Sequence, residues 1–296
     1  MAQRRYLPDL LLLLAALVWG TTFSIVKQAL DHTTPFTFMA IRFGLALLVI
    51  TPLLIARSRL PGRRELWGGI LTGISLFFGF PFQTWGLVYT TASRSAFITG
   101  LNVVLVPFLL WGLGQRKISA RRWLAASLAT LGIYLLVNPA AGAAINRGDL
   151  LTLLCAVAFA GQIILLAIYA PSTDTVGYFW VQVVTVTILA LGAAVGTRSL
   201  SLEPAAALWW ALAITGLLGT AAAFLGMTWA QRHVSPTRTA LLLATEPLFG
   251  ALFAVWIAGE FLGPVAWLGG LLIVGAVVWS ELSGTADPAA ADPEIG

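Results

Sequence analysis

The sequence contains few charged residues. Only 10% of its 296 residues are Asp, Glu, Lys or Arg, whereas a soluble domain carries roughly 25%. Hydrophobic residues make up 59% of the chain, and the mean hydropathy is +0.90. Because so few charges do not cover a water-facing surface, lipid is expected to surround most of the exterior. The composition therefore excludes an ordinary soluble domain and indicates an integral membrane protein in contact with the lipid bilayer.

Residues that commonly carry catalysis or bind metals are scarce. Cys155 is the single cysteine of the chain, which excludes an intrachain disulfide. The two histidines, His32 and His233, are distant in the sequence, so neither an H-E-x-x-H motif nor a histidine-based triad exists. We therefore expect no catalytic residue, no metal site and no cofactor, and we expect that the chain is not an enzyme.

Motifs of several other protein classes are also missing. Neither Lys27 nor Lys117 follows a glycine, which excludes a Walker A loop and ATP hydrolysis by that route. No glycine-rich carbonyl filter of the potassium-channel type is present. The net charge of +5 does not indicate nucleic-acid binding, because the basic residues lie in short clusters between apolar stretches, where they set topology.

Two pieces of sequence occur twice. Residues 9–16 read DLLLLLAA, and residues 149–156, which begin 140 positions later, read DLLTLLCA. Residues 84–96 read TWGLVYTTASRSA, and residues 228–240, which begin 144 positions later, read TWAQRHVSPTRTA. Such similarity within one apolar chain predicts a duplicated membrane unit, a construction that many secondary transporters use.

Ten segments are long and apolar enough to cross a bilayer, which requires about 20 residues. They are residues 8–30, 36–56, 66–89, 94–114, 121–138, 149–169, 176–197, 206–231, 236–258 and 262–282. Because each half holds five spans, an odd number, the second half enters from the opposite face. The sequence therefore predicts an all-α integral membrane protein of ten transmembrane helices. Two inverted five-helix repeats occupy residues 8–138 and 149–282, and residues 283–296 form a disordered cytoplasmic tail.

The basic residues predict the orientation of the chain. The segments assigned to the outer face hold at most Lys27, Arg94, Arg147 and Arg198. Those assigned to the cytoplasm hold Arg4, Arg5, Arg57, Arg59, Arg63, Arg64, Arg116, Lys117, Arg121, Arg122 and Arg232. Since cytoplasmic loops are enriched in Lys and Arg, both termini are expected in the cytoplasm.

Polar residues within the spans predict a binding cavity, because such residues are costly in lipid and often functional. The 140- and 144-residue registers pair Thr22 with Gln162, Arg42 with Gln182, and Asn102 with Glu246. Inverted repeats place a substrate site near the midplane between the halves. The residues expected to line it are Trp19, Thr22, Phe38, Arg42, Gln83, Thr99, Asn102, Phe159, Gln162, Tyr178, Gln182 and Glu246.

Arg42 and Glu246 each have two interpretations. Arg42 either pairs or snorkels within the bundle, or supplies positive charge for a substrate carboxylate or another anion. Glu246 either accepts hydrogen bonds within the bundle, or serves as a protonatable or cation-binding group that couples export to ions. The sequence leaves both choices open.

Several stretches resemble the EamA domain, the repeat unit of the drug/metabolite transporter superfamily. They are WGTTFSIVKQAL at 19–30, IRF at 41–43, ASRSAFITGLNVVLVPFL at 92–109, TEPLFGALFAVWIAGE at 245–260 and GGLLIVGAV at 269–277. Within the superfamily, the chain looks most similar to the YddG-type exporters of aromatic and other amino acids. The resemblance implies a multi-pass carrier of the bacterial inner membrane that exports amino acids, such as methionine and threonine, and related small metabolites through a central cavity. A monomer fits this reading, and the sequence leaves the oligomeric state open.

Three other functions are weighed against amino-acid export. A multidrug or cationic-compound exporter of the same superfamily is favoured by Glu246 and disfavoured by Arg42. A polytopic membrane enzyme acting on lipid-linked substrates would need a carboxylate or histidine pair clustered at one interface, and the sequence offers none. A passive channel would show flux without saturation or counterflow.

Overall fold

The structure, a computed structural model, describes residues 3–90, 92–114, 119–137, 145–258 and 263–282. The predicted tail at 283–296 lies outside the described residues. Helices dominate what is described, and one isolated β-bridge joins Thr33 to Leu202. The α-helices are α1 (Gln3–Ala29), α2 (Pro35–Ala56), α3 (Arg63–Tyr89), α4 (Ala92–Gly100), α5 (Asn102–Gly112), α6 (Ala120–Val137), α7 (Arg147–Tyr169), α8 (Thr175–Gly196), α9 (Ala206–Ala213), α10 (Ala223–Ala230), α11 (Pro236–Leu243), α12 (Glu246–Ala258) and α13 (Pro264–Leu282).

Two further helical pieces interrupt or extend these helices. A short 3-10 turn, Ala170–Ser172, follows α7. A π-helical segment, Ile214–Ala222, runs without a break between α9 and α10. We call this second piece the π segment. It gives one continuous helical stretch from Ala206 to Ala230.

Among the described residues, seven helical stretches are long and apolar enough to cross a membrane. Two shorter apolar stretches, Trp123–Leu136 and Pro264–Trp279, lie in α6 and α13. The seven are Tyr6–Ala29, Pro35–Ala56, Arg63–Tyr89, Ser95–Gly112, Arg147–Ser172, Thr175–Gly196 and Ala206–Ala230. The prediction of an all-helical, multi-pass membrane protein is therefore confirmed at this level.

Polar capping residues explain where several helices begin. Thr34 accepts a hydrogen bond from the backbone N–H of Thr37 at the start of α2. Asn146 and Asp149 form a reciprocal capping box at the start of α7. Such caps satisfy backbone N–H groups that have no partner in the first turn of a helix.

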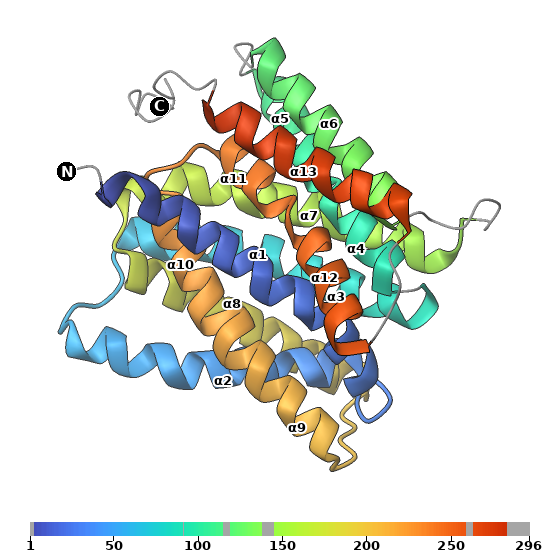
Figure 1. Cartoon of the computed structure of the whole chain (residues 1–296). Helices are drawn as coiled ribbons and strands as arrows, with labels where there is room; N and C mark the ends of the chain where they lie inside the picture. The colour runs from blue at the N-terminus through green and yellow to red at the C-terminus, as the bar shows by residue number, and fades with distance from the viewer. Residues whose placement is uncertain (1–2, 91, 115–118, 138–144, 259–262, 283–296) are drawn as a thin grey trace.

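The helices form a bundle in which segments from the two halves of the chain are interleaved. The long helix α7 lies along α3, α8 lies along α2, and α13 lies along α6. The helix α1 contacts both α10 and α12. The beginning of α1 and the end of α13 lie at the same end of the bundle (Figure 1). Each half of the chain therefore packs mainly against the other half.

Small residues allow some of these helices to come very close. A Cβ atom on Gly20 would lie 2.6 Å from the carbonyl oxygen of Glu246, where α1 meets α12. A Cβ atom on Gly132 would lie 2.8 Å from the carbonyl oxygen of Gly269, where α6 meets α13. Close backbone approach at small residues is characteristic of helix packing in membranes, where apolar surface gives no driving force between helices.

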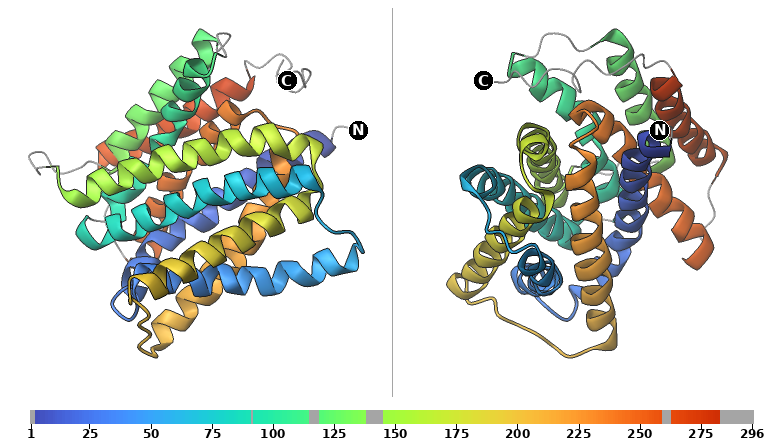
Figure 2. Two further views of the ribbon diagram at one scale, coloured as in Figure 1. Left: turned by 180° about the vertical axis from the view of Figure 1, so that it is seen from behind. Right: turned by 90° about the vertical axis from the view of Figure 1, so that its left-hand side faces the viewer.

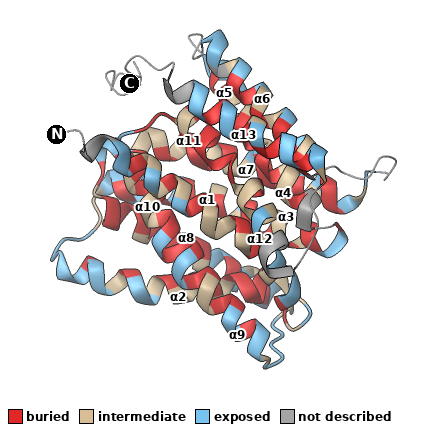
Figure 3. Ribbon diagram, viewed as in Figure 1, coloured by how far each residue is buried: buried red, intermediate tan, exposed pale blue. Residues whose placement is uncertain are grey.

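The outer surface of the bundle is apolar. Large side chains such as Leu48, Trp210 and Leu271 are about 70% exposed, and Figure 3 shows many exposed positions along the outlying helices α2, α9 and α13. In water such a surface would promote aggregation, whereas in a bilayer it faces lipid. The fold therefore turns apolar side chains outward and retains buried polar ones, such as Arg42 and Gln162, inside.

Candidate functional site

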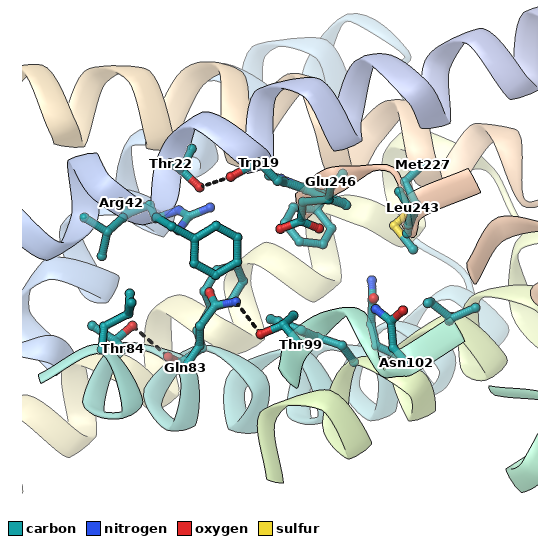
Figure 4. Close-up of a pocket in the computed structure, with 18 residues that line it drawn as sticks. Trp19, Thr22, Arg42, Gln83, Thr84, Thr99, Asn102, Met227, Leu243 and Glu246 are labelled. Atoms are coloured by element: carbon teal, nitrogen blue, oxygen red, sulfur yellow. Dashed lines mark hydrogen bonds between the residues drawn. The ribbon is translucent and has the colours of Figure 1, made fainter. Parts of the chain in front are cut away.

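A cavity lies in the interior of the bundle, between helices from both halves of the chain (Figure 4). Its volume is about 50 Å³, which leaves room for only a few water molecules. The lining residues are Trp19, Thr22, Phe23, Val26, Arg42, Phe80, Gln83, Thr84, Leu87, Thr99, Asn102, Phe159, Gln162, Ile163, Phe224, Met227, Leu243 and Glu246.

Most of the residues selected from the sequence meet at this cavity. They come from α1, α2, α3, α4, α5, α7 and α12, so the fold gathers them from distant parts of the chain. Nine of the twelve line it, namely Trp19, Thr22, Arg42, Gln83, Thr99, Asn102, Phe159, Gln162 and Glu246.

The other three, Phe38, Tyr178 and Gln182, do not line the cavity. The hydroxyl of Tyr178 lies 2.6 Å from the hydroxyl of Thr72 on α3, and the Gln182 side-chain amide donates to the carbonyl of Tyr178 at 3.5 Å. Phe38 is buried in an apolar cluster that also contains Phe23, a residue that does line the cavity.

Helix packing explains why Tyr178 and Gln182 of α8 do not face the cavity, although the 140-residue repeat pairs Gln182 with Arg42. A Cβ atom on Gly73 of α3 would lie 3.0 Å from the carbonyl oxygen of Gln182, and one on Gly69 would lie 3.1 Å from that of Tyr178. These glycines let α8 press against α3, so this face of α8 is covered by a helix. Its register mate on α2, which carries Arg42, faces the cavity instead.

Arg42 is the charged group on one wall of the cavity. Its side chain is buried, with 4% of the residue exposed. Nε donates a 2.7 Å hydrogen bond to the hydroxyl of Thr220, and Nη2 makes a longer 3.5 Å contact with the carbonyl oxygen of Gly219. The guanidinium also lies 4.4 Å from the centroid of the Phe80 ring, a distance typical of a cation–π contact.

Within the described part of the chain, Arg42 has no ion-pair partner. Its hydrogen-bond acceptors are a hydroxyl and a carbonyl. A buried cation in a membrane protein normally pairs with an anion or faces a water-filled space. Arg42 is therefore available to an anionic ligand.

Trp19, a residue of α1, links that helix to the segment that contacts Arg42. Its indole Nε1–H donates a 2.7 Å hydrogen bond to the carbonyl of Gly219. Its ring lies 4.7 Å from the ring of Phe224, centroid to centroid, at an interplanar angle of 44°. Thr22, one turn later, donates to the carbonyl oxygen of Trp19. The aromatic surface beside Arg42 is thus fixed by polar contacts at its edge.

The remaining walls carry polar groups with open hydrogen-bonding capacity. Gln83 donates a long 3.4 Å hydrogen bond to Thr99. Asn102 Oδ1 and Gln162 Nε2 are buried and have no partner among the described residues. Glu246 forms no ion pair within the described part of the chain. Since buried polar groups are normally hydrogen-bonded, these side chains are suited to hold water or a ligand.

Two helix breaks lie beside these groups. The helix α4 ends at Gly100 and α5 begins at Asn102, while α11 ends at Leu243 and α12 begins at Glu246. The breaks fall 144 positions apart, at Leu101 and Thr245. Discontinuous helices of this kind commonly build the substrate sites of membrane transporters.

The cavity therefore carries a guanidinium and a carboxyl group on its walls. In Figure 4, Arg42 and Asn102 lie at opposite ends, and Glu246 lies between them. The aromatic residues Trp19, Phe80, Phe159 and Phe224 also line the cavity. No three His, Cys, Asp or Glu side chains come together within the described residues to hold a metal ion.

Several lining residues were not selected from the sequence. Leu243 and Phe224 carried a signal, since Leu243 is the register mate of Thr99 and Phe224 follows Thr220 by one turn. Phe80 carried none, because an apolar residue in an apolar span gives no sign of facing a cation. Thr84 donates to the carbonyl of Phe80 in its own helix and contributes to the wall.

Comparison with known proteins places these observations in a family. The model of the EamA-like transporter family matches residues 7–138 and 146–281. An uncharacterized transporter of Archaeoglobus fulgidus is 35% identical over 276 residues, which cover 93% of this chain and 86% of that protein. The uncharacterized transporter YwfM of Bacillus subtilis is 26% identical over 291 residues, which cover 92% of this chain and 93% of the relative.

A solved structure has the same fold. A crystal structure with 19% sequence identity superposes with a TM-score of 0.78 and covers 94% of this chain and 97% of its own. At this level of identity the similarity concerns the fold alone.

Proposed function

Since this chain belongs to the EamA-like transporter family, we propose that it is a secondary transporter that exports amino acids and related small metabolites. The chain is a multi-pass membrane protein with relatives named as transporters. The proposal concerns what it carries, in which direction and by which residues. The observation that supports it most is the un-neutralised guanidinium of Arg42 in a cavity that also holds Glu246.

A free amino acid matches this pair of charges. Its carboxylate would bind Arg42, because a guanidinium presents donors in a geometry that suits carboxylates. Its amine would lie at Glu246 and the amide oxygen of Asn102. An apolar or aromatic side chain would lie against Trp19 and Phe159. Binding would thus give each unpartnered polar group a partner and remove the cost of leaving it buried alone.

The proposed architecture is ten spans in two inverted repeats, at residues 8–138 and 149–282. Ten spans result when α4 and α5, α9 to α10, and α11 and α12 are each counted as one. The matched helix breaks at Leu101 and Thr245 support the repeat relation. So does the packing, because α7 lies against α3 while α1, its register mate, lies against α10. The two termini would lie in the cytoplasm of a bacterial cell whose inner membrane holds the protein.

Transport would proceed by alternating access. The cavity of about 50 Å³ is too small for an amino acid, so helices or side chains must move for substrate to enter. Polar contacts hold the helices together at both ends of the bundle. Arg238 pairs with Asp9 at one end, and the Lys27 ammonium donates to the carbonyl of Thr90 at the other. Opening of each end in turn would expose the cavity first to one side and then to the other.

Substrate flux into proteoliposomes tests the proposal. Purified protein is reconstituted, and saturable uptake of labelled L-phenylalanine, L-methionine and L-threonine is compared for the wild type and Gln162→Ala, Asn102→Ala and Glu246→Gln. Reduced transport in these variants is the expected result. Unchanged transport in all three contradicts the assignment of the cavity as the substrate site.

A cationic-compound exporter is the second candidate. Glu246 supports it, because a carboxylate in an aromatic-lined cavity suits an organic cation. Arg42 opposes it, since its uncompensated charge on the same cavity repels such a substrate. Saturable transport of a cationic dye, without transport of any amino acid, would favour this second function.

A further inference from the structure

The π segment is an unusual element in this bundle. It comprises nine residues, Ile214–Ala222, between two α-helices. π-helical backbone occurs mostly as single-turn bulges and is frequently found at functional sites. Residues 70–78, which lie 144 positions earlier, belong to the regular α-helix α3. The π segment is therefore a property of one half of the chain and not of the repeat.

The π segment meets Arg42 through two consecutive residues. Thr220 accepts the 2.7 Å hydrogen bond from Arg42 Nε. Its hydroxyl in turn donates to the carbonyl of Thr215, five residues earlier, at 2.8 Å. The hydroxyl hydrogen is thus committed to the helix, and an oxygen lone pair is directed at the guanidinium. In a π helix this five-residue spacing is the backbone hydrogen-bond spacing as well, so the side chain follows the same geometry.

Gly219 supplies the second contact. Its carbonyl oxygen accepts the 2.7 Å hydrogen bond from Trp19 Nε1 and also lies 3.5 Å from Arg42 Nη2. Gly216, one turn earlier, lets α2 come close, since a Cβ atom there would lie 3.1 Å from the carbonyl oxygen of Arg42. The π segment therefore bonds the side chain of the arginine and packs close to its backbone.

We infer that Thr220 and the carbonyl of Gly219 are positioning residues that aim the guanidinium of Arg42 into the cavity, toward the anionic group of a substrate. The inference rests on the proposed function, because it assigns the anion to the transported molecule. The contacts engage Nε and Nη2. Nη1 has no hydrogen-bond partner among the described residues, and Arg42 is one of the residues that line the cavity.

The chemistry of the two acceptors supports this assignment. A carboxylate in the place of Thr220 would hold the guanidinium equally well and would also neutralise it, leaving little attraction for a second anion. A hydroxyl and a carbonyl fix the group and leave its net charge in place. The Phe80 ring, 4.4 Å from the guanidinium carbon, stabilises the charge from the side without consuming a donor.

The chain offers a matched control for Thr220. Thr215 belongs to the same π segment and is fully buried, as Thr220 is. Its hydroxyl donates to the carbonyl of Ala211 and makes no hydrogen bond with Arg42. Thr220→Val and Thr215→Val therefore make the same chemical change five residues apart, and only the first removes an acceptor from the arginine. Thr220→Ser keeps the acceptor and serves as the rescue variant.

The first measurement needs no substrate. Protein with ¹⁵N-labelled arginine is placed in lipid nanodiscs, and the Nε–H signal of Arg42 is identified by its loss in Arg42→Lys. Thr220→Val is expected to shift this signal and speed its exchange with water, while Thr220→Ser and Thr215→Val leave it near the wild-type position. An unchanged signal in Thr220→Val overturns the assignment of Thr220 as a positioning residue.

The second measurement tests whether the positioning matters for transport. For L-phenylalanine counterflow, Thr220→Val is expected to raise KM about tenfold, because a guanidinium that is not held at Nε aligns less well with the substrate carboxylate, with a smaller change in the maximal rate. In an Arg42→Lys background, which lacks Nε, Thr220→Val is expected to add nothing further. Equal, additive effects in the double variant overturn the inference, because they mean that Thr220 acts through helix packing.

The two measurements separate this inference from the proposed function. If the wild type carries no amino acid but Thr220→Val alters the Arg42 signal, the proposed substrate is wrong and the positioning contact stands. If amino acids are carried and Thr220→Val changes neither the signal nor KM, the proposed function stands and the positioning role is wrong.

Discussion

Arg238 and Asp9 form an ion pair of 2.9 Å that joins α11 to α1 at the end of the bundle where the chain begins. The two side chains are largely shielded, with 32% and 14% of their surfaces exposed. They belong to different halves of the chain. Asp149, which follows Asp9 by 140 positions, accepts a hydrogen bond from Thr90 at 2.8 Å. The Asp9–Arg238 contact ties α1 to α11, and the Asp149–Thr90 contact ties α7 to the residue that follows α3. Each contact is therefore suited to hold its own end of the bundle closed.

Loss of the Asp9–Arg238 pair is expected to open that end more often. Asp9→Asn would weaken the contact by about 1 kcal/mol, roughly fivefold in the population of the open form. The measurement is the labelling rate of Leu243→Cys, a cavity residue, by a membrane-impermeant thiol reagent in a Cys155→Ala background. The rate should rise from the side of the N-terminus alone.

The exchanged pair Asp9→Arg with Arg238→Asp is the control for this prediction. It should return the labelling rate toward the wild-type value, because the attraction between α1 and α11 is restored. A rate that rises equally from both sides, or that stays raised in the exchanged pair, would show that the contact stabilises the fold without closing one end.

Tyr178 should matter for stability and not for substrate binding. Its hydroxyl bonds Thr72 at 2.6 Å and lies outside the cavity. Tyr178→Phe is therefore expected to lower the free energy of unfolding by about 1 kcal/mol and to leave KM for L-phenylalanine unchanged. Thermal unfolding in detergent and counterflow measure the two quantities. A raised KM with unchanged stability would place Tyr178 in the site after all.

Glu246 should show the opposite behaviour. Within the described residues it has no ion-pair partner, so Glu246→Gln replaces an acidic group that is costly to ionise without a partner by a neutral amide of similar size. We expect the melting temperature to stay the same or rise while amino-acid counterflow falls.

Glu65→Gln is a matched control for Glu246→Gln. Glu65 pairs with Arg59 at 2.7 Å and accepts backbone hydrogen bonds from Gly62 and Asp174. The substitution should lower the melting temperature, since a glutamine has only one side-chain oxygen to accept from the two backbone donors and does not pair with Arg59. Equal destabilisation by both substitutions would mean that Glu246 is a structural residue.

Gly20 should be sensitive to a single methyl group. A Cβ atom there meets the backbone of α12 at 2.6 Å and 2.8 Å, so Gly20→Ala must push α1 away from the helix that begins with Glu246. The expected loss of stability is about 1–3 kcal/mol, measured by thermal unfolding in detergent. Gly44→Ala is the control, because nothing lies within 4 Å of a Cβ atom on Gly44. Equal melting temperatures would contradict the tight contact.

The sequence was sufficient to predict where most helices begin and end. Apolar runs set their length, and capping or proline residues such as Thr34, Asn146 and Pro236 mark their starts. The predicted starts at 36, 149 and 236 lie within two residues of those in the structure. These signals are local, so they can be read without knowledge of the fold.

Helix packing accounts for the position of Gln182, a predicted site residue, outside the cavity. The 140-residue repeat makes Arg42 and Gln182 equivalent positions. However, glycines on α3 allow α8 to pack close to it, so that α3 covers Gln182. The π segment gave no signal either, because ITGLLGTAA reads as ordinary apolar helix. Its residues Thr220 and Gly219 contact Arg42 and Trp19, which only the folded structure brings close to them.

Counterflow by Arg42 variants in proteoliposomes tests the central claim most directly. Vesicles loaded with an unlabelled amino acid take up the same labelled compound, and a panel of amino acids is compared with cationic dyes. The account predicts saturable counterflow of at least one amino acid by the wild type, a raised KM in Arg42→Lys and loss of counterflow in Arg42→Gln, because the substrate carboxylate then lacks its cation. Wild-type counterflow of amino acids in Arg42→Gln, or counterflow of cationic dyes alone, would contradict it.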